Sequence, residues 1–144
     1  MGGRGTRFTP GATVLDPLRM QALLLRDADG KGLLLLSIDM IGLSGDVSAR
    51  FRREIAAHIG LAPSGIVLNF SHTHSGPMSG YEGYATDRPK PVEMIAYEET
   101  LLEKACALAR AAQESEERVS VRWHRGTSHI GINRRARNER GEMA

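Results

Sequence analysis

The chain has 144 residues, of which 41% are hydrophobic and 25% are charged, and this length suffices for one globular domain with a sizeable core. Its one cysteine, Cys106, excludes a disulfide framework within a single chain, and no apolar run approaches the roughly 20 residues needed to cross a bilayer. The net charge of +2 rests mainly on arginine, which is frequent towards the C-terminus. A nucleic-acid-binding surface is not expected, because no aromatic residues are interleaved with these arginines after Trp123.

The arginine-rich C-terminal stretch has three interpretations. A solvated surface is the favoured one; the others are contact with an acidic partner or a membrane surface, and one or two arginines that face a substrate. Residues 1–10 lack the apolar centre of a signal peptide. The compartment is left open by the sequence, since a longer parent protein is compatible with a secreted or a cytoplasmic location.

Residues 18–26 and 33–39 form two apolar runs that flank a turn-forming segment, DADGKG at 27–32. Turn residues between two such runs predict a β-hairpin. The second run begins with consecutive leucines at 33–36, which predicts a strand that is buried on both faces of a helix-covered sheet.

A first helix is expected over 46–59, because apolar residues recur at every fourth position from Val47 onwards. Ser44 is a suitable N-cap, and Gly60 occupies the position where a glycine commonly ends a helix. The next apolar run, 66–70, predicts a strand that leads into a loop rich in glycine, tyrosine and proline.

A second helix is expected over 94–113, with Cys106 on its apolar side and Glu98 and Glu99 on its polar side. Valine and tryptophan then alternate with polar residues over 119–123, which predicts a half-buried strand. The elements together follow the order β-β-α-β-loop-α-β. This order favours an α/β fold, a layered mixed sheet with covering helices, in which the second and third strands are joined by a right-handed crossover if they are parallel.

The loop after the third strand begins SHTHSGP at 71–77 and is the most informative candidate site in the sequence. It is expected at the carboxyl end of a strand, where ligand sites collect in α/β sheets. His72 and His74 share one face if the extended geometry of the strand continues into the loop. Two such imidazoles either bind one zinc ion together, or one binds the metal while the other contacts substrate.

Four strings of residues resemble, in the same order, the N-terminal part of the neutral/alkaline non-lysosomal ceramidase family. They are DPL at 16–18, SIDMIGLS at 37–44, HTHSGP at 72–77 and GINRR at 131–135. The resemblance extends over about residues 16–135, and HTHSGP is its most specific piece. It implies a zinc-dependent hydrolase that cleaves the amide bond of N-acylsphingosine into sphingosine and a fatty acid.

The resemblance also implies roles for individual residues. His72 is implied to be a zinc ligand, and His74 to face the substrate, where it can donate a hydrogen bond to negative charge that develops on the amide oxygen. Arg134, in the Asn-Arg pair of the last string, resembles an arginine that contacts substrate. Asp39 is expected at a strand end near the site, where its carboxylate can orient a histidine. For the ring nitrogen of His72 that does not bind metal, Asp39 and a backbone carbonyl are both suitable acceptors.

The later zinc ligands of the family, a second histidine, a glutamate and a tyrosine, and its nucleophilic serine come from segments that follow the region matched here. Residues 1–144 are therefore expected to be a partial N-terminal catalytic domain, an incomplete part of a larger hydrolase. The isolated chain is expected to bind zinc weakly and to lack amidase activity. Two alternatives stay open: another metal hydrolase with an HxH pair, such as a barrel amidohydrolase, and a non-catalytic remnant or binding module.

Overall fold

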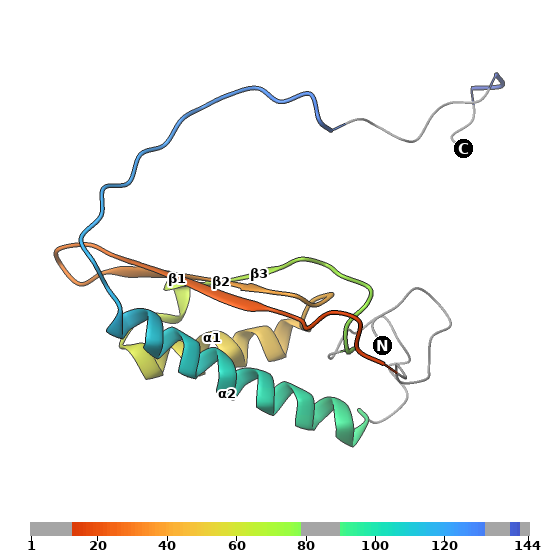
Figure 1. The fold of residues 1–144 in the computed structure, drawn as a ribbon, viewed down its shortest axis with the longest axis horizontal. Helices are drawn as coiled ribbons and strands as arrows, with labels where there is room; N and C mark the ends of the chain where they lie inside the picture. Colours follow the sequence, from red (N-terminus) through yellow and green to blue (C-terminus); the bar gives the residue numbers. More distant parts are fainter. Residues whose placement is uncertain (1–12, 79–89, 132–138, 142–144) are drawn as a thin grey trace.

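A three-stranded sheet and two α-helices make up the folded body of the protein in the computed structural model, which describes residues 13–78, 90–131 and 139–141 (Figure 1). In chain order the elements are β1 (Met20–Arg26), β2 (Gly32–Ile38), α1 (Gly45–Ile59), the short 3-10 helix η1 (Pro63–Gly65), β3 (Ile66–Phe70) and α2 (Val92–Glu114). The predicted small α/β fold with a mixed sheet and covering helices is confirmed.

The strands lie in the order β1-β2-β3, with β1 antiparallel and β3 parallel to β2. The predicted hairpin is confirmed, and its turn is closed by the Asp27 carboxylate, which accepts hydrogen bonds from the backbone N–H groups of Asp29 and Lys31. Gly30 supplies a positive φ of 79° in this turn, a conformation that costs glycine little. The crossover from β2 to β3 runs through α1, and both helices lie on the same face of the sheet (Figure 1).

Helix α1 confirms the helix predicted from the apolar spacing, and Gly60 ends it in the left-handed conformation with φ 69°. Ser44 precedes the helix as predicted, but its side chain does not form a capping hydrogen bond. The hydroxyl of Ser44 donates to the carboxylate of Asp46 at 2.6 Å and makes no cap hydrogen bond to a backbone N–H. Asp46, in the first turn, is placed where a negative charge is favourable to the helix dipole.

The core lies between the sheet and the two helices. Its fully or almost fully buried side chains are Leu34, Leu36, Ile38, Met40, Phe51, Ile55, Ala56, Ile59, Ile66, Leu102, Ala105 and Ala109. The opposite face of the sheet is open, and Leu23, which lies on it, is 52% exposed. The prediction that the leucine-rich strand is buried on both faces is therefore wrong. Side chains alternate between the two faces of a strand, and the described helices cover only one of these faces.

Helix α2 is slightly longer than predicted, and Cys106 is buried in the core as expected. Glu98, which was predicted to lie on the polar side, is buried instead, and its carboxylate accepts a hydrogen bond from Lys90 Nζ at 2.5 Å. The reason is helical spacing, since Glu98 lies four residues before Leu102 and seven before Ala105, on the side that packs against the core.

Residues 116–131 leave the end of α2 as an extended segment that runs away from the folded body (Figure 1). The predicted strand over 119–123 is not formed, and Trp123 is 84% exposed. Alternation of apolar and polar residues predicts a half-buried strand only when a neighbouring strand is paired with it, and none is paired with this segment in the described part of the chain. Across the described ranges, the structure contains no helix with the length and apolar character of a membrane span.

Candidate site at the carboxyl edge of the sheet

Strands β2 and β3 end side by side, with Ile38 paired to Phe70, and the loops that follow them meet at this edge. The first residue after β3, Ser71, donates its backbone N–H to the carbonyl of Ile38 at 3.1 Å. The first residue after β2, Asp39, is tied to the segment before β1, because its N–H donates to the carbonyl of Arg19 at 2.9 Å. Segments that are far apart in the sequence thus converge at one edge of the sheet.

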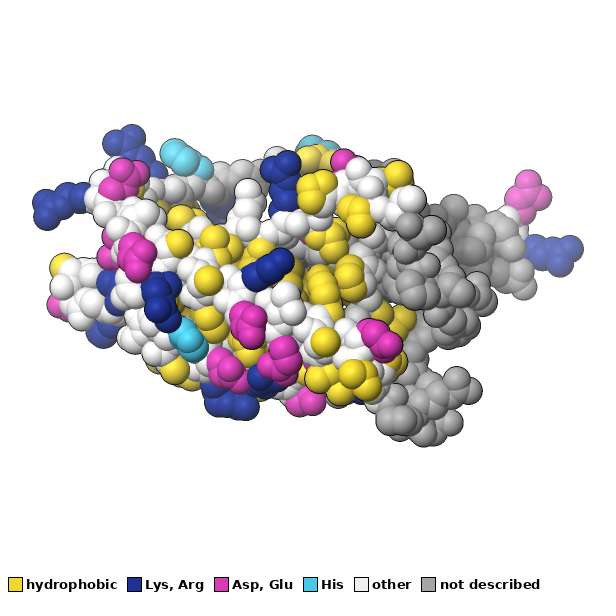
Figure 2. Space-filling model, turned by 60° about the horizontal axis from the view of Figure 1, so that its bottom comes forward, with side chains coloured by type: hydrophobic (Ala, Val, Ile, Leu, Met, Phe, Trp, Pro, Cys, Tyr) yellow, Lys and Arg dark blue, Asp and Glu magenta, His cyan; other side chains and the backbone are white. Residues whose placement is uncertain are grey.

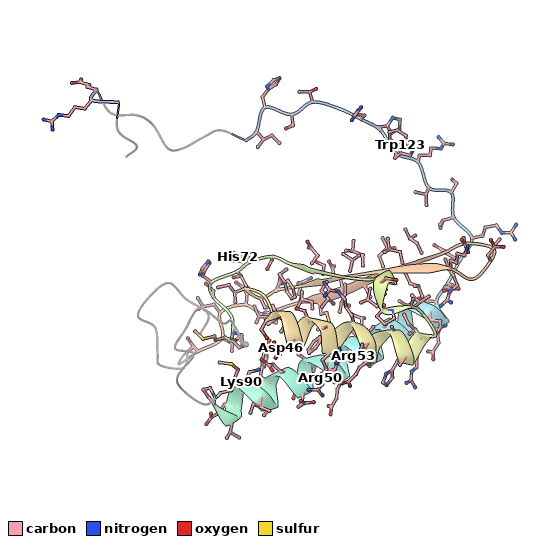
Figure 3. All side chains as sticks on the ribbon, turned by 180° about the vertical axis from the view of Figure 1, so that it is seen from behind. Asp46, Arg50, Arg53, His72, Lys90 and Trp123 are labelled. Carbon is pink, nitrogen blue, oxygen red and sulfur yellow. The ribbon has the colours of Figure 1, made fainter. Side chains whose placement is uncertain are left out.

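His72 stands at this edge in a left-handed backbone conformation, with φ 57°. Its Nδ1 lies 2.9 Å from the carbonyl oxygen of Ile41, in the loop after β2. In a neutral imidazole such a contact holds the proton on Nδ1 and leaves the lone pair of Nε2 available to a metal. The ring lies at the end of the sheet, well away from the charged side chains Asp46 and Arg50 on the helix side (Figure 3).

His74 contacts His72 edge to face, with 5.0 Å between the ring centroids and 85° between the ring planes. The rings meet although the extended geometry that would have placed them on one face does not continue past β3, since His72 has a left-handed backbone conformation. The Nδ1 atom of His74 is buried and has no hydrogen-bond partner within the described ranges. A buried polar atom without a partner is costly, so this nitrogen has unused capacity to bind a ligand.

Gly76 brings the histidine loop into close contact with its neighbours. A Cβ atom at this position would lie 3.2 Å from Leu18 Cδ1 and 3.8 Å from the carbonyl oxygen of Asp39. A Cβ here would require the Leu18 side chain to shift slightly, while its contact with the Asp39 carbonyl oxygen would be an ordinary one. The three strings around Leu18, Asp39 and His72 are consequently packed against one another at the carboxyl edge.

Asp39 follows β2, with its carbonyl oxygen near Gly76 of the histidine loop, and its carboxylate accepts a hydrogen bond from the backbone N–H of Arg19 at 3.1 Å. The ring of His72 is held by the carbonyl of Ile41, the backbone alternative to Asp39. Among the described residues no hydrogen bond joins the Asp39 carboxylate to a histidine, so the predicted orienting contact is not seen. Arg134, the predicted substrate contact, lies outside the described residues, as does Asn133.

The centroid separation of the two imidazoles is ordinary for an edge-to-face contact, and it is also compatible with two ligands of one zinc ion. With Zn–N bonds of about 2.0–2.1 Å and a tetrahedral angle, two histidine ligands of one zinc have ring centroids roughly 5 Å apart, which agrees with the observed 5.0 Å. The described residues contain no group of three or more His, Cys, Asp or Glu side chains that could hold a metal. Since protein zinc sites use three or four protein ligands, two histidines would leave one or two ligands to be supplied by other residues.

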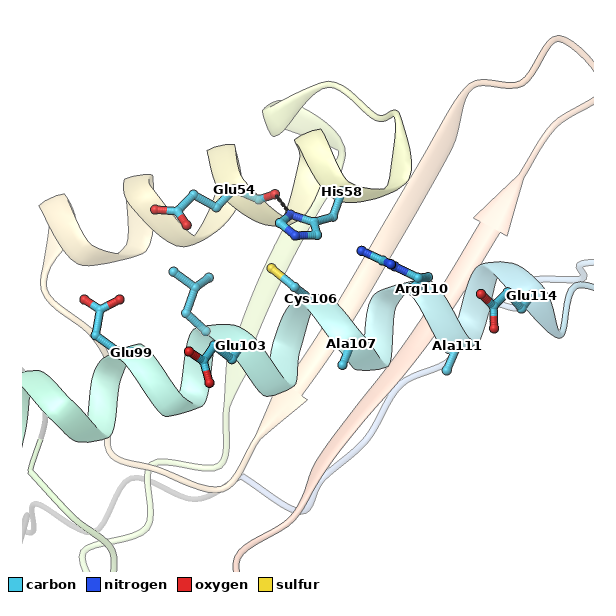
Figure 4. A pocket seen from close by; sticks show the side chains of 10 residues that line it. Glu54, His58, Glu99, Glu103, Cys106, Ala107, Arg110, Ala111 and Glu114 are labelled. Carbon is cyan, nitrogen blue, oxygen red and sulfur yellow. Dashed lines mark hydrogen bonds between the residues drawn. The ribbon is translucent and has the colours of Figure 1, made fainter.

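A second polar region is the groove between α1 and α2, a cavity of about 550 Å³ (Figure 4). Its lining includes Glu54, His58, Glu99, Glu103, Cys106, Arg110 and Glu114. This groove was not predicted from the sequence, although acidic residues at helical spacing indicate a charged helix face. The space-filling view of the helix side shows acidic and basic side chains interspersed over this surface (Figure 2).

Ion pairs account for the most perturbed groups on this surface. Arg50 binds Glu99 and Glu54, and these carboxylates raise the pKa of the Arg50 guanidinium, while Arg50 lowers the pKa of Glu99. Burial raises the pKa of the Cys106 thiol, so the thiol stays protonated and unreactive at neutral pH. The groove is a charged helix surface with paired groups, whereas the histidine loop contains a buried nitrogen that is unpaired among the described residues.

No protein-family model, curated protein or solved structure matches this chain.

Proposed function

We propose that the protein is part of a zinc-dependent amide hydrolase that acts on an N-acyl lipid such as ceramide, with His72 as a zinc ligand. The main support for the proposal is the packing of distant segments at one edge of the sheet. Three of the four strings that resemble the ceramidase family, around Leu18, Asp39 and His72, lie far apart in the sequence and pack together at one edge of the sheet. Chemistry-bearing residues at the carboxyl end of parallel strands are the usual arrangement of an α/β active site.

Amide hydrolysis needs help at the carbonyl, because an amide is a poor electrophile. A bound zinc ion supplies this by polarising the carbonyl or by lowering the pKa of a bound water to about 7. The chain's own residues prepare the site. Ile41 fixes the tautomer of His72 through its carbonyl. We assign to His74, which contacts His72, the hydrogen bond to the oxygen on which negative charge develops.

We further propose that the catalytic domain is larger than residues 1–144. His72 alone, or His72 with His74, gives fewer than the three or four protein ligands of a zinc site, and the described residues contain no larger group of such side chains. The open face of the sheet also supports this, because Leu23, Leu33, Leu35 and Val67 are exposed on it in a contiguous row across the three strands. The remaining ligands and the nucleophile then come from other segments of the same hydrolase.

The test is an activity assay on the longest product that the gene encodes. We expect zinc-dependent release of fatty acid from an N-acylsphingosine and a loss of more than ~100-fold in kcat/KM for His72→Ala, since even residues that only support a zinc ligand cost about 10–100-fold. His58→Ala is the control, because His58 is an exposed histidine on α1. Full activity of the His72→Ala variant would contradict the proposal.

The same preparation separates the alternatives. Zinc-dependent hydrolysis of other amides, without action on N-acylsphingosine, would indicate a different HxH hydrolase. Salt-dependent binding to anionic vesicles that persists in a His72→Ala/His74→Ala variant, without any hydrolysis, would indicate a binding module.

A further inference from the structure

The core is incompletely covered on the side of β1, an edge strand of the sheet. Met20, Ala22 and Leu24 pair with Ile38, Leu36 and Leu34, the helix-side residues of β2. Their partners on β2 are fully or almost fully buried, but these three residues are only partly buried although they are packed against the core. The outer N–H and C=O groups of β1 face no paired strand among the described elements.

Helix α2 contributes two more half-buried side chains to this side, Tyr97 and Leu108. They are eleven residues apart, a spacing that returns to the same side of an α-helix. That side is turned away from the α1–α2 groove, because Cys106, which lines the groove, lies two residues from Leu108 and thus about half a turn round the helix. We call the surface formed by Met20, Ala22, Leu24, Tyr97 and Leu108 the β1 flank.

The extended segment after α2 starts beside this flank. Arg26, the last residue of β1, donates from Nε to the carboxylate of Glu116 at 2.9 Å. From there Val119, Val121 and Trp123 alternate with Arg118, Ser120, Arg122 and His124. An extended chain with this pattern has one apolar and one polar face, and in the structure both faces are exposed.

We propose that residues 118–124 bind to the β1 edge as an antiparallel fourth strand and that Val119, Val121 and Trp123 cover the β1 flank. The direction follows from the anchor, because a chain that leaves Arg26 and runs along β1 must run antiparallel to it. The length agrees, since β1 and the segment each have seven residues. Edge pairing also satisfies the backbone groups of the segment, whereas lying flat on the open face of the sheet would leave them unpaired.

The register follows from the side-chain pattern. A slip of one residue turns every side chain to the other face, so the register that buries the apolar face is the stable one. With Val121 opposite Ala22, Val119 faces Leu24 and Trp123 faces Met20, all on the helix side. The arginines and Ser120 then lie on the open face, in solvent.

Binding of this segment has a consequence for the candidate site. β1 begins at Met20, beside the end of β2 at Ile38, and this is the edge that carries the histidine loop. A fourth strand antiparallel to β1 ends at the same edge. The chain that follows Trp123 is thereby delivered to the side of the sheet where His72 stands.

Trp123 is the only tryptophan in the chain, so its fluorescence reports on the proposed docking directly. We expect a blue-shifted emission and a severalfold lower acrylamide quenching constant than in urea. Val121→Asp, on the apolar face, should restore free quenching, and Ser120→Asp, on the polar face, should not. Quenching of the unmodified protein as free as in urea would overturn the proposal, and so would equal effects of the two variants.

Cysteine pairs in a Cys106→Ala background test the register independently of fluorescence. Opposed residues of an antiparallel pair have Cα atoms about 4.5–5.5 Å apart, within disulfide range. Val121→Cys should form an intramolecular disulfide with Ala22→Cys under mild oxidation, and it should not form one with Leu23→Cys, which points to the open face. No crosslink, a crosslink to Leu23→Cys only, or disulfide-linked dimers would each overturn the proposal.

Discussion

The helix side of the sheet and the loops at its carboxyl edge involve the same strands. They differ in how completely their apolar side chains are buried and their polar groups are paired. Under the sheet, apolar side chains of β2 pack against α1 and α2 with almost no exposure, and the buried carboxylate of Glu98 has a cationic partner in Lys90. At the edge, His72 holds a left-handed backbone conformation and His74 keeps a buried nitrogen without a partner in the described part of the chain.

This difference distinguishes residues that stabilise the fold from residues that are candidates for ligand binding. A residue that only stabilises the fold gains nothing from strained backbone or unused hydrogen-bonding capacity, while a ligand-binding site often contains both. Substitutions in the core on the helix side of the sheet should therefore lower stability and leave metal binding intact. Substitutions in the histidine loop should impair metal binding and change stability less.

The largest effect on stability is expected from Leu36→Ala, which empties a fully buried position under the sheet. Leu36 is 0% exposed, whereas its neighbour Leu35 is 38% exposed on the open face. We expect Leu36→Ala to lower the free energy of unfolding by roughly 2–5 kcal/mol and Leu35→Ala by about 1 kcal/mol or less, as measured by urea denaturation. Similar losses for both variants would mean that the two faces are equally covered in solution.

A smaller loss is expected from removing the charge of Glu98. Its side chain is 6% exposed and paired with Lys90, while the side chain of the adjacent Glu99 is 46% exposed and paired with Arg50. Glu98→Gln should destabilise the protein by roughly 1–3 kcal/mol, because it weakens a buried charge-assisted pair. Glu99→Gln, the matched control, should cost clearly less in the same assay, because solvent screens this pair. The reverse order would contradict the burial of Glu98.

In the histidine loop, the substitution that removes more of the side chain is expected to be the more stable one. His72 has φ 57°, which glycine adopts without strain. His72→Gly should be more stable than His72→Ala by about 1 kcal/mol, since alanine retains the Cβ that disfavours this conformation. Both variants should lose the response to zinc. Equal stabilities, measured by thermal unfolding, would show that the backbone of His72 is unstrained in solution.

The smallest effect concerns the start of α1. The hydroxyl of Ser44 is the main cause that lowers the pKa of Asp46, followed by the backbone N–H of Val47. A lowered folded-state pKa contributes stability above the unfolded pKa, and this contribution is lost as the pH falls through the folded-state value. Ser44→Ala should raise the pKa of Asp46 towards its ordinary value, which a carboxyl-carbon NMR titration can follow. An unchanged titration curve would show that Ser44 does not hold this carboxylate.

Local sequence patterns predicted most of the fold because the hairpin, α1, β3 and α2 each depend on residues close in the chain. The wrong predictions concern features that are determined by tertiary contacts. Burial of Glu98 depends on which side of α2 meets the core, and the open face of β2 depends on which helices cover the sheet. The segment over 119–123 has the pattern of a strand, but pattern alone does not supply a pairing partner.

The candidate site was predictable in its residues and not in its geometry. The HTHSGP string identified His72 and His74, and the crossover placed them at the carboxyl edge of the sheet. The left-handed backbone conformation of His72 and the edge-to-face contact of the two rings were not predicted, because the prediction assumed that the extended strand geometry continues. Nor does any local pattern show that Ile41 would hold the ring of His72, because that contact spans 31 positions in the sequence.

The most direct test of a zinc site at this edge is a zinc titration of the protein followed by NMR of the imidazole nitrogens. The chain has five histidines, so His58, His124 and His129 serve as internal controls for His72 and His74. We predict that zinc shifts the Nε2 resonance of His72 first, that His74 responds with it, and that Nδ1 of His72 stays protonated. A uniform response of all five histidines, or a first response at His58, would contradict a zinc site in this loop.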